Sequence, residues 1–245
     1  MTSTTFPVTI EQQRAAKVVG LTTLLMMVIV VFANYVLLNP LIVPGKAAET
    51  AQNILAHQGT FRLTVICFLL YSAGVVVLLS SLFVVLKPVK RGLALAGALF
   101  RLVFAMLWLL STLHLLSALR FLGTANYLQV FEADRLQVLA RLSIAAIFDD
   151  YYVGLPFFAL ASTVCSYLWF KSNYIPRALA GFGVIASAWC LLCAFIYLVF
   201  PGFAKPVDPY WFDSPMGIFE LVLAFWLLFK GLRLSPTGNA AVVTP

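Results

Sequence analysis

The sequence predicts an all-α membrane protein with six transmembrane helices. Of its 245 residues, 62% are hydrophobic and only 10% are charged, and its mean hydropathy is +0.99. Soluble domains carry about 25% charged residues, so this chain has too few polar side chains to cover a water-exposed surface. The apolar residues are gathered into long runs. Composition and run length together predict one polytopic membrane domain.

Six apolar runs are long enough to cross a bilayer, because a spanning helix needs about 20 residues at a rise of about 1.5 Å each. The segments between the runs carry turn-forming or charged residues, as in NPLIVPGK, KPVKRG and KSNYIPR. Tyrosines and tryptophans lie near the span ends, as in the interfacial belts of membrane proteins. The predicted spans are residues 18–38, 63–86, 93–120, 150–170, 178–200 and 216–233.

The distribution of lysine and arginine predicts that both termini are cytoplasmic. If the N-terminus is inside, the inner segments hold nine basic residues and the outer segments hold six, while Arg101 lies within a span. Inner segments of membrane proteins are enriched in basic residues, which favours this orientation. The expected organisation is a cytoplasmic tail over 1–17, a transmembrane domain over 18–234 and a flexible cytoplasmic tail over 235–245.

Two segments on the predicted outer side are compatible with helices, namely residues 46–62 and 126–148. The second has apolar residues at helical spacing, a pattern typical of amphipathic helices that lie in the membrane interface. We expect both segments to cap the bundle on its outer side. The apolar positions of the second segment are Leu128, Phe131, Leu136, Leu139 and Leu142.

Other classes of partner find little support in the sequence. The net charge is +7, but the basic residues form no stripe with interleaved aromatics, so nucleic acid is not an expected partner. The four cysteines lie in apolar runs, which argues against a disulfide framework. No cofactor and no metal is predicted, because no motif for either occurs. The lipid bilayer is the expected partner, and the oligomeric state stays open.

Four stretches of the chain, in this order, point to a known family: VPGKAAETAQNILAHQGTFR, LKPVKRGLALAGALFRLV, YLWFKSNYIPRALAGFGVI and FELVLAFWLLFKG. Together they resemble a bacterial six-helix family known only as a domain of unknown function, number forty-three eighty-six. The resemblance covers about residues 14–233. It implies a multi-pass protein of the cell inner membrane and brings no activity. The chain departs from the family pattern at Phe219, Ala159 and Ala161, where members carry glycine or a polar residue.

Glu220 is the acid that the apolar sequence makes most conspicuous. If its span begins near residue 216, the carboxylate lies about 5 residues below the outer surface, where an unpaired charge is costly. We expect it to face the bundle interior within about 4 Å of a polar partner. A cation on the third span is the expected partner, and His114 matches its depth better than Arg101 does. The alternative role is a structural ion pair between helices.

The other polar candidates have two interpretations each. Arg101 lies close to mid-bilayer, or its side chain reaches the inner head groups if the long third span shifts outward. His114 forms a hydrogen bond between helices or belongs to a site. Asp149 and Asp150 form either a hydrated helix start or a carboxylate pair for acid–base chemistry, and the sequence leaves open whether they lie within the membrane or at its surface.

The depth of these residues predicts a polar pocket that opens outward above a closed inner half. We expect this pocket to bind a small amphiphile, lipid-like or isoprenoid, and its candidate ligand-binding residues are Arg62, Arg101, His114 and Glu220. An alternative is a membrane-embedded enzyme that acts on a lipid-like substrate by acid–base chemistry. A small-solute transporter and a subunit or interaction module are further alternatives. The catalytic candidates are Glu220, His114, Asp149 and Asp150.

Overall fold

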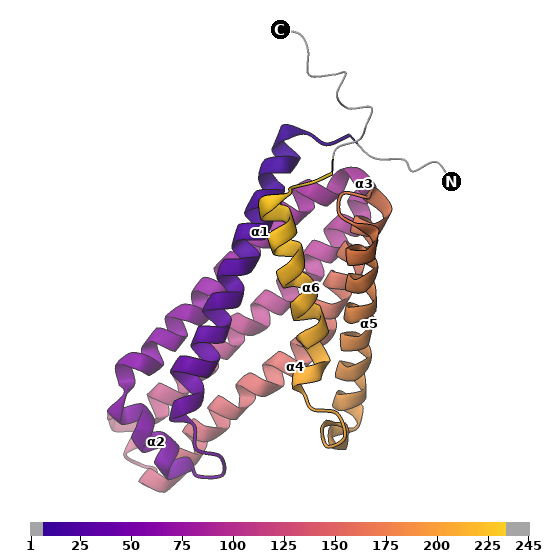
Figure 1. Ribbon diagram of the computed structural model, residues 1–245. Coiled ribbons are helices and arrows are strands. Elements are labelled where there is room, and N and C mark those ends of the chain that lie inside the picture. The colour runs from indigo at the N-terminus through magenta and orange to yellow at the C-terminus, as the bar shows by residue number, and fades with distance from the viewer. Residues whose placement is uncertain (1–6, 234–245) are drawn as a thin grey trace. The chain divides into compact units, whose positions relative to one another are not determined.

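The computed structural model describes residues 7–233, and within that range the chain is helical, without strands. The predicted all-α class is therefore confirmed. Residues 1–6 and the predicted C-terminal tail lie outside the described residues. The main helices are α1 (Ile10–Val31), α2 (Ala47–Ala56), α3 (Gln58–Phe121), α4 (Ala133–Ser172), α5 (Arg177–Val199) and α6 (Tyr210–Phe229) (Figure 1). Short helical turns follow α1 at Phe32–Leu38 and Asn39–Leu41, and others lie at Asn126–Leu128 and Pro201–Ala204.

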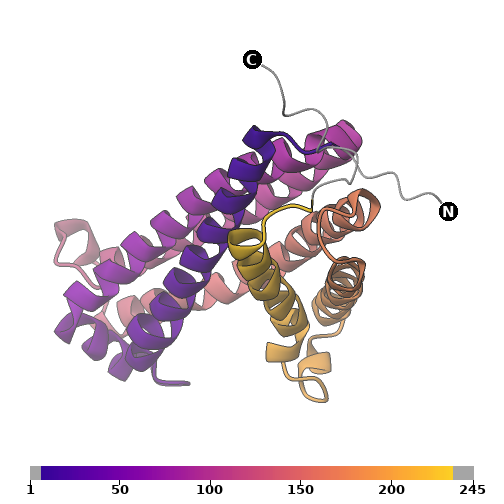
Figure 2. The same ribbon diagram turned by 45° about the horizontal axis from the view of Figure 1, so that its top comes forward.

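Five helices of the described chain are long and apolar enough to cross a membrane: α1 with its following turns, α3, α4, α5 and α6. The chain is thus a multi-pass membrane protein. At 64 residues, α3 is about three times the length that one crossing needs. Its backbone leaves the helical region at Lys90, where φ is −162° and ψ is 99°. The predicted break between the second and third spans, in KPVKRG, falls at this residue. Figure 2 shows that α3 is two helical arms that fold back on each other.

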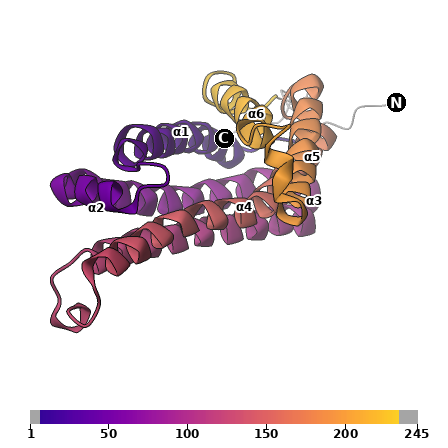
Figure 3. The same ribbon diagram turned by 90° about the horizontal axis from the view of Figure 1, so that it is seen from below.

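Three predicted boundaries differ from the structure. Residues 133–148 of the second outer segment and the fourth span form one continuous helix, α4, which runs from Ala133 without interruption (Figure 3). No glycine or proline separates residues 133–148 from the span, so the helix does not end at the two aspartates. The last helix begins at Tyr210 and not at residue 216. At the other end of the chain, α1 begins at Ile10, within the predicted tail.

The chain forms two compact units. In its described part, unit 1 comprises residues 7–25, 75–104 and 153–233, and unit 2 comprises residues 26–74 and 105–152. In unit 1, Gly20 of α1 packs directly on α6, where a Cβ atom would lie 2.7 Å from the carbonyl oxygen of Ala224. The absence of a side chain therefore sets how closely these helices approach. The fully buried large side chains of the unit 1 core include Leu86, Leu168, Trp169, Tyr174 and Ile175.

Hydrogen bonds join four separate segments of unit 1 at one end, which we call the clamped end. Gln12 Nε2 donates to the Val85 carbonyl at 3.1 Å and to the Tyr174 hydroxyl at 3.3 Å. Gln13 Oε1 accepts from the Leu232 amide at 3.0 Å, and the Arg233 amide donates to the Tyr174 carbonyl at 2.9 Å. The beginning of α1, the α3 turn, the α4–α5 connection and the end of α6 are thereby held together.

Two local features make the clamped end possible. Gly231 ends α6 with a φ of +67°, a conformation that glycine adopts at little cost. It also leaves room for Gln13, because a Cβ at this position would overlap the Gln13 Nε2 atom. Burial raises the pKa of the Tyr174 hydroxyl, and the hydrogen bond from Gln12 partly opposes this change. Tyr174 therefore stays neutral and accepts from Gln12.

Unit 2 contains a cluster of aromatic side chains around Trp108. Its ring lies 4.9 Å from the ring of Phe68 and 4.7 Å from that of Tyr71, and Tyr151 of α4 contacts it at 6.5 Å. Tyr71 and Trp108 lie 19 and 18 residues from Lys90, on its two sides. Nearly equal separations from one turn mean that the two arms of α3 run antiparallel in this unit. The aromatic contacts hold both arms against α4.

Candidate functional site

The first candidate site is a buried ion pair in unit 1. Arg101 Nη1 of α3 donates to Glu220 Oε1 of α6 at 2.6 Å, and the two side chains are only 8% and 14% exposed. The Arg101 guanidinium also lies 4.6 Å from the ring centroid of Phe158, which stacks on Phe104 at 4.8 Å. A charged hydrogen bond and a cation–π contact therefore compensate both ions for the loss of water. The expectation that Glu220 has an interior polar partner on the third predicted span is confirmed.

The expected identity of that partner is wrong, because Glu220 pairs with Arg101 and not with His114. The error follows from the start of α6. A helix beginning at Tyr210 places Glu220 ten residues from its first residue and nine from its last, at mid-helix. Arg101 lies about 10 residues from Arg91, at a similar depth in a helix of about 1.5 Å rise per residue.

The second candidate site lies in unit 2 and contains His114. His114 Nδ1 lies 2.9 Å from Asp150 Oδ2, and Ser111 Oγ donates to the same oxygen at 2.9 Å. The Asp150 side chain is 8% exposed and that of His114 is 28% exposed. Because one helical turn separates Ser111 from His114, α3 presents both to a single residue of α4. Asp150 is therefore a buried partner, whereas the adjacent Asp149 is exposed.

This second arrangement constrains the chemistry of each group. With Asp150 ionised, the Nδ1 atom of His114 carries the proton of their hydrogen bond, so a neutral imidazole has its lone pair at Nε2. Ser111 donates to the carboxylate and not to the imidazole, so it is not arranged as a histidine-activated nucleophile. In this tautomer, Nε2 of His114 is the ring nitrogen at which proton transfer can occur.

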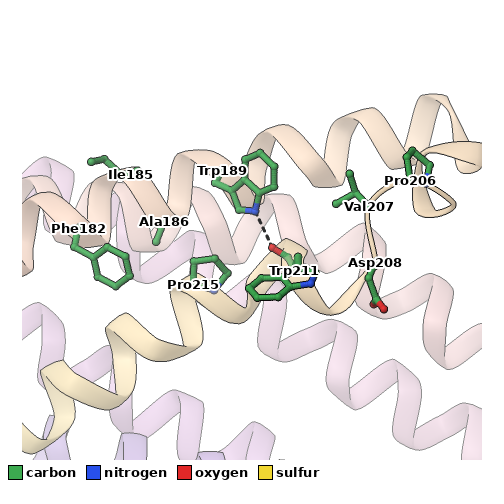
Figure 4. Close-up of a pocket in the computed structure, with 9 residues that line it drawn as sticks. All are labelled: Phe182, Ile185, Ala186, Trp189, Pro206, Val207, Asp208, Trp211 and Pro215. Atoms are coloured by element: carbon green, nitrogen blue, oxygen red, sulfur yellow. Dashed lines mark hydrogen bonds between the residues drawn. The ribbon is translucent and has the colours of Figure 1, made fainter.

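A third candidate site is an apolar groove of about 550 Å³ in unit 1, between α5, the α5–α6 connection and the first residues of α6 (Figure 4). It extends from Phe182 past Trp189 to Asp208, and the volume is in the range of small-molecule sites. Asp208 is the only ionisable side chain of its lining. The residues that line it are Phe182, Ile185, Ala186, Trp189, Pro206, Val207, Asp208, Trp211 and Pro215.

A proline and a tryptophan shape this groove. Pro215 is the sixth residue of α6 and has no N–H to donate to the carbonyl of Trp211, four residues earlier. Trp189 Nε1 of α5 donates to that carbonyl at 2.7 Å instead, as the dashed line in Figure 4 shows. The indole thus replaces the missing backbone bond and joins the two helices at the groove.

The candidates from the sequence fall into separate places. Arg101 pairs with Glu220 and His114 with Asp150, whereas Arg62 and Asp149 are exposed. None of these six residues lines the groove. Ser111 and Phe158 were not among the predicted site residues, and for Ser111 the available signal was its spacing of one helical turn from His114. Within residues 7–233, no three histidine, cysteine, aspartate or glutamate side chains form a group that could hold a metal ion.

Comparison with known proteins gives the family of the chain. The model of the family described as "Domain of unknown function (DUF4386)" matches residues 18–231. The chain belongs to this family. The resemblance found from the sequence is therefore confirmed, and the family description carries no activity.

Among curated proteins, the DUF4386 chain is similar to an uncharacterised protein of Archaeoglobus fulgidus. The two are 28% identical over 155 residues, which make up 63% of this chain and 75% of the relative. No solved structure matches the chain.

Proposed function

We propose that this DUF4386 protein crosses the cell inner membrane six times, with both termini cytoplasmic, and binds a small lipid-like or isoprenoid amphiphile. The groove of unit 1 is the proposed binding site, and it opens near the outer surface in this orientation. The observation that carries the proposal is the polarity of the groove. Its apolar lining along α5 and α6 ends at one carboxylate, Asp208. An amphiphile has the same division between chain and head group.

The clamped end supports an even number of crossings. Gln13 binds the Leu232 amide, so the beginning of α1 and the end of α6 lie on the same side. Five single crossings would leave these two residues on opposite sides of a membrane. Two crossings by α3, one on each side of the turn at Lys90, make the total six.

The groove is a more suitable binding site for an amphiphile than the Arg101–Glu220 pair is. Arg101 and Glu220 already neutralise each other, so a head group would have to displace a buried ion pair. In contrast, Trp211 is 63% exposed and its indole lies at the groove. Aromatic rings of this kind suit the boundary between an acyl or isoprenoid chain and its head group. We therefore assign the ion pair a structural role.

The test removes one indole from the groove without removing a hydrogen bond. In Trp211→Ala, the backbone carbonyl that accepts from Trp189 remains. We expect at least a fivefold loss of lipid-like molecules that co-purify in mild detergent, measured by mass spectrometry, because a buried aromatic contact contributes about 1 kcal/mol or more. Asp208→Asn tests the head-group end and keeps the oxygen that accepts from the Tyr210 amide.

The matched control is Phe229→Ala, which removes an exposed aromatic side chain at the opposite end of α6. It should leave the co-purified molecules unchanged. Equal loss in both variants, or no loss in Trp211→Ala, contradicts the proposal. Solute uptake by vesicles that contain the protein would favour the transporter, and a co-purifying membrane protein without lipid would favour the interaction module.

A second candidate function is acid–base catalysis by His114. The supporting observation is the buried Asp150, which fixes the imidazole with Nε2 available for proton transfer. If the protein modifies a lipid, Asp150→Asn should lower turnover of a bacterial lipid extract at least tenfold, measured as product by mass spectrometry. Asp149→Asn changes the adjacent exposed acid and should have little effect. Equal rates in the two variants exclude this role.

A further inference from the structure

The clamped end of unit 1 carries a dense group of exposed cations, which we call the basic rim. Four described segments meet there, 10–17, 87–91, 171–177 and 230–233, and they contain nine basic residues and one acidic residue, Glu11. All nine basic residues are exposed. They are Arg14, Lys17, Lys87, Lys90, Arg91, Lys171, Arg177, Lys230 and Arg233.

Two arginines of the rim are ordered by contacts within unit 1. The Arg233 guanidinium lies 5.4 Å from the ring centroid of Trp226, and its backbone amide is held by Tyr174. Arg177 lies 5.9 Å from the ring of Phe170, and its Nε donates to Asn173 at 2.6 Å. Side chains held in this way lose less conformational entropy when they bind an anion.

The position of the rim relates it to the membrane surface. α1 and α5 begin at this end and α6 ends here, and all three are candidate membrane spans. Charged side chains at the ends of such helices lie at the level of lipid head groups. Guanidinium groups above aromatic rings present N–H donors that match phosphate oxygens.

We propose that the basic rim binds anionic phospholipids, with Arg233 and Lys230 contacting the head-group phosphate. The proposal goes beyond the amphiphile groove, since it concerns other residues and another ligand charge. The excess of eight positive charges raises the affinity of the rim for a head group with net negative charge. It raises the affinity for a zwitterionic head group only a little. Each basic residue near an anionic surface contributes about a fivefold increase in affinity.

The experiment uses the purified full-length protein in a neutral detergent. The protein is immobilised and exposed to equal amounts of phosphatidylglycerol and phosphatidylcholine with the same acyl chains, and bound lipid is quantified by mass spectrometry. We expect at least 25-fold more phosphatidylglycerol on the wild-type protein at low salt, and a large decrease of this preference at about 0.5 M salt. This comparison needs no substitution, so it does not depend on the folding of a variant.

The double variant Lys230→Gln/Arg233→Gln should lower phosphatidylglycerol binding about 10- to 25-fold, and Arg233→Lys should retain most of it because the charge remains. The charge-matched control is Arg120→Gln/Arg135→Gln, which removes two exposed cations of unit 2 and should bind as the wild type does. Equal binding of the two lipids by the wild-type protein overturns the proposal. An equal loss in the control pair, or capture of an acidic protein without any lipid preference, also overturns it.

Discussion

At the scale of single residues, the ion pair of Arg101 and Glu220 shows how buried charge is accommodated in this chain. Arg101 and Glu220 come from helices far apart in the sequence, and each is nearly inaccessible. A pair of this kind contributes little net stability over two apolar residues, but removal of one partner leaves an uncompensated buried charge. The pair therefore acts mainly by fixing which residues of α3 and α6 face each other.

The coupling of Arg101 and Glu220 predicts how three variants behave. Glu220→Leu should lower the free energy of unfolding by about 3 kcal/mol, since Arg101 loses its acceptor. Glu220→Gln should be less harmful, because the amide oxygen still accepts from Arg101. The double variant Arg101→Met/Glu220→Leu should be more stable than Glu220→Leu alone. Thermal unfolding in detergent measures the stability of all three, and a double variant no more stable than Glu220→Leu contradicts the coupling.

At the scale of helices, α6 illustrates that a proline need not end a helix. Pro215 suggests a boundary, because a proline within a helix removes a backbone hydrogen bond. The structure continues the helix through it, and Trp189 of α5 supplies the missing donor to Trp211. A residue on another helix thus satisfies the carbonyl that Pro215 leaves without its backbone donor.

A second helix-scale prediction concerns the contact of α1 with α6. Gly20→Ala places a methyl group 2.7 Å from a backbone oxygen of α6, so the helices must separate. We expect a loss of about 2 kcal/mol of unfolding free energy. Gly217→Ala is the matched control within α6, because its Cβ meets nothing within 4 Å. It should be neutral or stabilising by up to about 1 kcal/mol, and equal losses in the two variants would refute the packing argument.

At the scale of the whole molecule, topology is the property to test first. Reporter fusions after Lys90 and after Arg177 should give a cytoplasmic signal, and fusions after Gly59 and after Lys205 should give an external one. The physical reason is the concentration of basic residues in the segments of the clamped end. An external signal after Arg177 would be incompatible with six crossings.

The sequence predicted local features well and long-range features poorly. The run 178–200 matches α5, at 177–199, and the KPVKRG motif coincides with the turn at Lys90, because hydropathy and turn chemistry act locally. The start of α4 was missed, since two adjacent aspartates resemble a helix start. Asp150 is instead buried beside His114, a contact between residues 36 positions apart that no local pattern indicates. Gln12 and Gln13 were assigned to a tail because their partners, Val85, Tyr174 and Leu232, are also distant in the sequence.

The hydrogen bond between Gln13 and Leu232 also has a consequence for biosynthesis. These residues are separated by 219 positions, so α1 emerges from the ribosome long before its partner exists. At about 5–20 residues per second, the interval is about 10–45 seconds. During that time the surface of α1 around Gly20 has no α6 to pack against. Unit 1 can therefore reach its final packing only after α6 has been synthesised. Until then, α1 lacks the helix against which its Gly20 surface packs.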